Sequence, residues 1–131
     1  MEYVYVTSEQ SKNIYPHNVW YDFRVALPKE LYFPSGYECA LLSFDIYPSN
    51  DLDCNIFCDI LEQTSFENSL LPHLSVVKSP PERFTFLHFK KVINPRISSF
   101  RIYIRRPYTN EPPSESFQFS QLELLFRECS S

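Results

Sequence analysis

The three histidines are the side chains of this sequence best suited to acid–base chemistry, and they lie in three separate segments. His17, His73 and His88 have no cysteine, serine or carboxylate at a spacing that defines a known catalytic motif. The single glycine also makes a phosphate site lined by backbone groups hard to build. The sequence therefore predicts no catalytic residue and no cofactor site, although a site assembled from distant residues around His88 or His17 stays open.

Carboxylates are a second group that could do chemistry. Four of them crowd around one turn: Asp45, Asp51, Asp53 and Asp59. They could bind calcium, but they lack the glycine and the regular ligand spacing of an EF-hand. A solvated acidic turn is the favoured interpretation, so no metal is implied.

Cysteines are the third such group: Cys39, Cys54, Cys58 and Cys129. Cys54 and Cys58 share one face of an expected strand and lie roughly 13 Å apart at ~3.3 Å per residue, too far for a disulfide between them. No histidine stands at zinc-ligand spacing from them. We expect small buried thiols in a reducing compartment.

Half of the 12 basic residues fall between positions 90 and 106. Arg101, Tyr103 and Arg105 would share the outer face of one strand, where they could contact phosphate or an acidic neighbouring protein. A solvated sheet face is the simpler interpretation. The net charge of −4 disfavours a dedicated nucleic-acid binder, so nucleic-acid contact stays open but is not favoured.

These residues must be positioned by strands, because apolar residues alternate along much of the chain. In residues 22–43, a strand is expected to stop at Pro28, Phe33-Pro34-Ser35-Gly36 predicts a type I turn, and a second strand follows, giving a central hairpin. The second strand should turn one apolar face inward, from Tyr37 through Leu41. Other strands are expected at residues 2–7, 54–61, 74–77, 84–92, 100–105 and 121–127, with loops at 8–19 and 107–116.

Composition bounds the architecture. A chain of 131 residues with 44% hydrophobic and 17% aromatic residues suits one ordered domain over residues 1–131. About eight short strands and no helix predict an all-β fold, a single jelly roll or a jelly-roll-like antiparallel β-sandwich. The sequence has no secretion signal and no apolar run near ~18 residues, so we expect a soluble protein made in the cytosol.

Six segments in a fixed order carry a family resemblance: YVTSEQSKNIYPHN, NVWYDFRVALPKELYFPSGYECALLSFDI, IFCDILEQTSFENSLLPHLSVV, FTFLHFKKV, ISSFRIYIR and SFQFSQLELLFRE. In order and spacing they resemble capsid-type proteins of Polinton (Maverick) elements and the related adintoviruses, assigned as minor capsid or penton single jelly rolls. The chain differs from that pattern at residues 62–66 and 119–121, where relatives tend to carry Pro, Val-Gly and a further glycine.

The resemblance implies a non-enzymatic structural protein of the virion, a minor capsid or penton-like vertex component. Its partners would be other copies of itself, five of them at a vertex, and a major capsid protein. It would be made in the host cytosol, with the nucleus as a candidate place of assembly. No membrane span is expected.

The contact residues expected for such assembly are aromatic and basic side chains on strands and loops: Tyr3, Tyr5, Trp20, Tyr21, Arg101, Tyr103, Arg105 and Tyr108. The alternative function is a host-directed module that binds a receptor or a glycan. In that case Trp20, Tyr21 and loop tyrosines would form the ligand platform.

Overall fold

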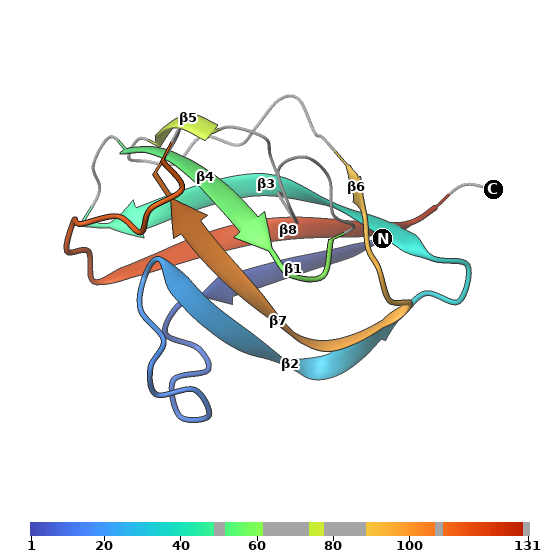
Figure 1. The fold of residues 1–131 in the computed structure, drawn as a ribbon. Coiled ribbons are helices and arrows are strands. Elements are labelled where there is room, and N and C mark those ends of the chain that lie inside the picture. The colour runs from blue at the N-terminus through green and yellow to red at the C-terminus, as the bar shows by residue number, and fades with distance from the viewer. Residues whose placement is uncertain (49–51, 62–73, 78–88, 107–108, 130–131) are drawn as a thin grey trace.

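The computed structural model describes residues 1–48, 52–61, 74–77, 89–106 and 109–129, and for residues 52, 53 and 74–77 only the backbone is described. In these ranges it contains eight strands and no helix (Figure 1). The strands are β1 (Glu2–Thr7), β2 (Asp22–Tyr32), β3 (Tyr37–Tyr47), β4 (Leu52–Cys58), β5 (Leu74–Val77), β6 (Lys90–Lys91), β7 (Arg96–Arg105) and β8 (Phe119–Glu128). β6 has only two residues, so seven strands are four residues or longer. None of the described residues forms a helix that could span a membrane.

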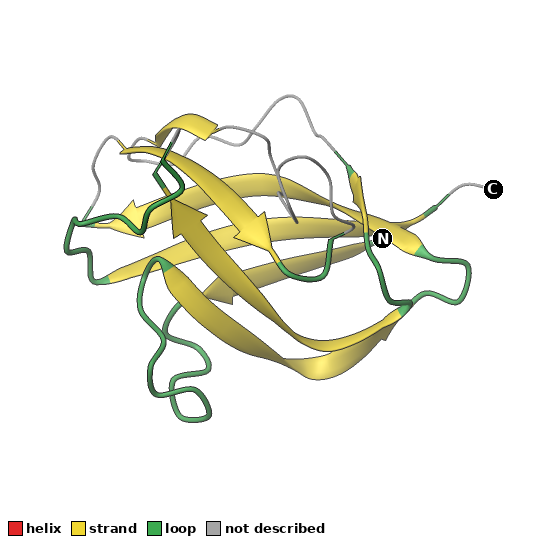
Figure 2. Ribbon diagram, in the orientation of Figure 1, coloured by secondary structure: helices red, strands yellow, loops and turns green. Residues whose placement is uncertain are grey.

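The strands form two antiparallel four-stranded sheets that pack face to face (Figure 2). One sheet has the order β1-β8-β3-β6 and the other has the order β2-β7-β4-β5. The predicted all-β sandwich is therefore confirmed. Apart from β4 and β5, neighbouring strands within each sheet are not consecutive in the chain, so the sheets are assembled largely by long-range pairing.

The core lies between the sheets and follows the alternation of the sequence. Phe100, Ile102 and Ile104 of β7 are fully buried on the face opposite to the outward face predicted for this strand. From the other sheet β8 contributes Leu122 and Leu124, which are also buried. Each large apolar side chain removed from water in this way contributes about 1.5–3 kcal/mol, which is why one face of each strand is fixed inward.

The turn between β2 and β3 forms where it was predicted, but the two strands do not make a hairpin. Gly36 N donates to Phe33 O at 3.0 Å, and Gly36 has a φ of 83°, which glycine adopts without strain. β2 pairs with β7, whereas β3 pairs with β8 and β6. The chain thus crosses from one sheet to the other, because the apolar faces of both strands are buried by facing each other across the core. The Phe33 and Tyr37 rings meet there with centroids 4.5 Å apart.

The prediction that Pro28 ends the strand is wrong, because β2 continues to Tyr32. β2 is an edge strand, and its register with β7 shifts between Ala26 and Leu31. A proline is tolerated at such an irregular edge position because no ladder partner requires its missing N–H.

Other strand boundaries differ from expectation as well: β7 starts at Arg96 and β8 spans Phe119–Glu128, so both are longer than expected. β4 starts at Leu52 and ends at Cys58, where a turn replaces the expected continuation to residue 61. Of the strand expected at residues 84–92, residues 84–88 lie outside the described residues, and Lys90–Lys91 pair with β3. The strand expected at 74–77 is confirmed, as is the loop at residues 8–19.

Candidate binding surface

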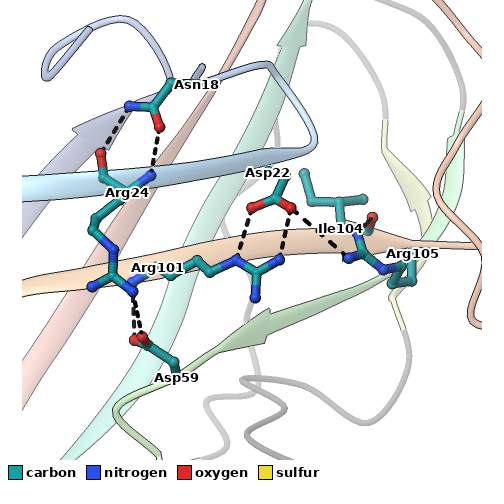
Figure 3. Close-up of polar contacts among 7 residues, drawn as sticks. All are labelled: Asn18, Asp22, Arg24, Asp59, Arg101, Ile104 and Arg105. Carbon is teal, nitrogen blue, oxygen red and sulfur yellow. Dashed lines mark hydrogen bonds and ion pairs between the residues drawn. The ribbon is translucent and has the colours of Figure 1, made fainter. Parts of the chain in front are cut away.

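A network of ion pairs covers part of the outer face of the sheet β2-β7-β4-β5. The register of β2 and β7 places Arg24 directly opposite Arg101, a like-charge pair that would repel on its own. Two carboxylates, Asp22 and Asp59, lie against these guanidinium groups and offset that repulsion (Figure 3). Arg24, Arg101 and Arg105 together with Asp22 and Asp59 are called the arginine network below.

Asp22 is the centre of the arginine network. Arg101 donates to it twice, from Nε to Oδ1 at 2.8 Å and from Nη2 to Oδ2 at 2.7 Å, which is the bidentate geometry of a strong guanidinium–carboxylate pair. Arg105 Nη2 lies 3.9 Å from the same Oδ2 (Figure 3). The hydrogen bonds to Asp22 raise the pKa of Arg101 above its ordinary value. One carboxylate therefore holds two arginines of β7.

Asp59 and Asn18 fix the rest of the network. Asp59, just after β4, accepts from Arg24 Nη2 at 3.2 Å and from the main-chain N of Arg101 at 2.9 Å. The buried Asn18 side chain makes two hydrogen bonds with the main chain of Arg24: its Nδ2 donates to Arg24 O and its Oδ1 accepts from Arg24 N, both at 2.9 Å (Figure 3). A neighbouring strand would bond to Arg24 in the same way. The loop before β2 is thereby held against the sheet edge.

A groove of about 570 Å³ lies between this loop and the sheet. Its apolar wall includes Ile14, Val19 and Tyr21, and its charged floor includes Asp22, Arg24 and Arg101. The exposed His17 lies at the same groove. An apolar wall beside charged groups is the usual composition of a site that contacts a partner or a ligand.

Tyr103 sits within a stack instead of projecting alone from the sheet. Its ring lies on Phe57 with centroids 5.0 Å apart and an interplanar angle of 11°. The guanidinium carbons of Arg101 and Arg105 lie 4.6 and 5.0 Å from its centroid, within cation–π range. The predicted outward face of Arg101, Tyr103 and Arg105 is confirmed, but these charges are paired within the chain. Phe57 is buried beneath this stack.

The expectation that Trp20 is exposed is wrong. Trp20 is 4% exposed, and its Nε1 donates to Glu115 O at 3.1 Å. Its ring meets Phe117 edge to face with centroids 4.8 Å apart. Trp20 is buried because the segment that precedes β8, far away in the sequence, covers the turn in which it lies.

The remaining expected contact residues fall in two places. Tyr3 and Tyr5 are 58% and 71% exposed on β1. Tyr21 packs against the core and lines the groove beside the arginine network. Tyr108 lies outside the described residues.

Sequence reasoning did not assign the carboxylates and the asparagine that organise this surface. A signal existed for Asp22, which is two residues before Arg24 and so shares its strand face. Asp59 was grouped with Asp45, Asp51 and Asp53 as an acidic turn, but it bonds to the arginines. Within the described residues no three His, Cys, Asp or Glu side chains gather as a metal site would need.

Three of the four thiols are buried in the core, as predicted: Cys39, Cys54 and Cys58. Burial raises the pKa of Cys39 and of Cys58 above the ordinary thiol value. Burial also raises the pKa of Tyr37, whose buried hydroxyl has no hydrogen-bond partner among the residues that the structure describes. Thiols kept protonated in an apolar core are poor nucleophiles and poor metal ligands.

Comparisons of the chain with protein family models, with curated proteins and with solved structures found no match.

Proposed function

We propose that this chain is a non-enzymatic structural protein with a jelly-roll fold that assembles through protein–protein contacts as a minor capsid or penton-like vertex component. The nested pairing of its strands carries the proposal. The first strand pairs with the last, the second with the one before the last, the third with the sixth, and the two middle strands with each other. This nested pairing supports a jelly-roll arrangement, in which one long hairpin is rolled into two sheets, as in viral capsid proteins and lectins.

The step from this pairing to a capsid is a fold-level analogy. A second support is the resemblance of the ordered segments to minor capsid and penton proteins of Polinton-type elements. A third is the chemistry of the candidate surface, where the arginines and aspartates bond to one another. Groups that saturate each other in this way build a rigid surface instead of presenting a reactive group to a substrate.

The partners proposed are further copies of the chain and a major capsid protein. Five copies would close a ring at a vertex through one patch that meets a different patch on the next copy. The protein would be made in the host cytosol and end in the virion, with the nucleus as a candidate assembly site. Contact with nucleic acid is not favoured, because Asp22 and Asp59 offset much of the charge that phosphates would need.

The test is co-expression of the chain with a major capsid protein of a Polinton-type element, followed by gradient purification of the particles. The chain should sediment with the particles at a copy number that matches their vertices, and it should stay at the top of the gradient when expressed alone. Particles that form normally and leave the chain entirely in the soluble fraction would overturn the proposal.

The groove beside the arginine network favours a second candidate, the host-directed binding module. Tyr21 lines this groove, whereas the buried Trp20 does not belong to a ligand platform. A glycan array probed with the purified chain tests it. Binding that is lost in Tyr15→Ala, a substitution in the groove, and kept in Tyr32→Ala, a substitution at an exposed tyrosine on β2, would favour this function.

A further inference from the structure

The groove beside the arginine network is held in shape by bonds from buried side chains of the loop at residues 8–19. Two of these side chains fasten the loop to the outer edge of β2. Ser11 Oγ accepts from the main-chain N of Ala26 at 3.0 Å, and Asn18 bonds to both main-chain groups of Arg24. Ser11 and Asn18 are 3% and 7% exposed, so these bonds are shielded from water. The groove is therefore preformed, and an occupant loses little free energy to ordering the loop.

The loop side of the groove is apolar and exposed. Ile14 and Val19 line it, and they are 57% and 40% exposed. Tyr15 and Pro16 extend the same wall. Exposed aliphatic side chains at a concave surface are typical of a site that covers an apolar group of a partner. The wall therefore predicts an apolar group in the occupant.

The sheet side of the groove carries one positive charge in excess. Arg24, Arg101 and Asp22 line it, Asp59 lies outside it, and the exposed His17 adds no negative charge. Asp22 is held by the bidentate bonds of Arg101, so the charge of Arg24 is balanced only from outside the groove, by Asp59 (Figure 3). Among the described residues, the Arg24 side chain uses Nη2 alone of its donors, and a guanidinium has five N–H groups. A carboxylate can therefore bond to Arg24 without displacing Asp59.

We propose that this groove binds a short peptide segment of another protein in which an aspartate or glutamate stands beside an apolar residue. The carboxylate bonds to Arg24, and the apolar side chain lies against Ile14 and Val19. A peptide fits better than a sugar because the wall is largely aliphatic, and Trp20, which could stack on a sugar ring, is buried. It fits better than nucleic acid because a row of phosphates brings more negative charge than a groove with an excess of one can balance.

The inference names the class of occupant of the groove and does not depend on the capsid proposal. The pair of Arg101 and Asp22 loses part of its water when the groove fills, and this cost keeps the affinity modest. The test is therefore selection of random peptides, displayed in several copies on phage, against the immobilised chain, because multivalent display detects weak binding. Enriched peptides should carry Asp or Glu beside an aliphatic or aromatic residue. An enriched peptide, made synthetically and titrated into the isotope-labelled chain, should shift the NMR signals of residues 14–24 most.

Three variants separate the charge from the apolar wall. Arg24→Gln should weaken an enriched peptide about tenfold or more, because it removes a charge-assisted hydrogen bond. Ile14→Ser should weaken it several-fold, because it shortens the wall. The matched control is Arg96→Gln, which removes an arginine that pairs with Glu30 outside the groove and should leave binding unchanged. Circular dichroism checks folding, and if Arg24→Gln does not fold, Ile14→Ser, on the exposed loop, decides in its place.

The inference is overturned if no peptide is enriched over the starting library, if enriched peptides lack an acidic residue, or if folded Arg24→Gln binds them as tightly as the wild type. A glycan that binds the wild type and not Ile14→Ser, with no peptide enriched, would assign the groove to sugars and overturn it as well. A chain that sediments with capsid particles but enriches no peptide would overturn this inference and leave the capsid proposal standing. A chain that binds such peptides and never enters particles would do the opposite.

Discussion

Replacing Asp22 with asparagine keeps the size of the side chain but removes the charge that holds Arg101 and Arg105. A charge-assisted hydrogen bond contributes about 1.5–3 kcal/mol when it is well shielded, and an exposed ion pair only ~0.2–1 kcal/mol. The Arg101 and Asp22 side chains are 39% and 33% exposed, which lowers the contribution of this pair toward that of an exposed ion pair. Its bidentate geometry raises the contribution again. We expect Asp22→Asn to lower the free energy of unfolding by about 1–2 kcal/mol.

Urea unfolding followed by tryptophan fluorescence measures this change. Trp20 is the one tryptophan of the chain, it is buried, and it lies two residues from Asp22, so its emission reports unfolding of this region. The matched control is Glu30→Gln, which breaks an ion pair with Arg96 whose side chains are 47% and 61% exposed. The control should cost less than about 0.5 kcal/mol. High salt should shrink the difference between the two variants, because the ion pairs are partly screened.

The reasoning is refuted if Asp22→Asn costs no more than Glu30→Gln at low salt. That result would mean that the bidentate geometry adds nothing beyond an ordinary surface pair. A slope of unfolding against urea that differs from the wild type would need separate treatment, since the variant would then have changed the compactness of one state.

Three further predictions concern the core. Burial raises the pKa values of Tyr37, Cys39 and Cys58 in the folded chain. The stability that their burial in the neutral form contributes is complete below the ordinary thiol pKa of about 8.5, and it is lost as pH rises through the raised pKa values of the folded chain. The free energy of unfolding should therefore be lower at pH 10 than at pH 7, and a higher value at pH 10 would contradict this reasoning. A thiol reagent should label Cys129, which is partly exposed, before the three buried thiols, and equal rates for all four would contradict their burial. Phe100→Ala should cost about 3–5 kcal/mol in the same urea experiment because it leaves a cavity between the sheets, and a cost below ~1 kcal/mol would show that the site collapses.

The inward faces of β7 and β8 could be predicted from the sequence because burial of one face imposes a period of two. Phe100, Ile102 and Ile104 alternate without interruption, and each is fully buried. A one-residue slip would have moved all of them to the solvent side, so the pattern fixes the face strongly. The turn at Gly36 was predictable for a similarly local reason, since one residue there needs a positive φ.

The pairing partners could not be predicted in the same way. Alternation in β2 and β3 gives the buried face of each strand but not the neighbour along the sheet, and a short connection suggested a hairpin. In the folded chain Val25 of β2 pairs with Phe100 of β7, a contact that no local pattern encodes. The prediction that Pro28 ends the strand failed for a related reason. A proline interrupts a central strand but is tolerated in an edge strand, and the sequence of β2 does not tell which of the two it is.

The candidate surface shows the same division between local and distant information. The shared outward face of Arg101 and Arg105 follows from alternation. The partner Asp59 lies 42 residues before Arg101, and the Trp20 indole bonds to a carbonyl 95 residues away. Contacts over such separations decide which polar groups are already bonded, so exposure and function of these residues could not be derived from their own segments.

This division also bears on which of the expected contact residues would carry the proposed assembly. A partner that docks on the arginine network must desolvate ion pairs that already satisfy one another, and that cost offsets much of what new contacts would contribute. The exposed rings of Tyr3 and Tyr5 instead offer aromatic surface to a partner, and a contact there displaces no bond within the arginine network. We therefore expect Tyr3 and Tyr5 to contribute more to association between copies than Arg101 and Arg105. Substituting Tyr5 with alanine should then weaken association more than substituting Arg105 with alanine, as measured by native mass spectrometry at equal concentration, and the reverse order would place the contact on the arginine network.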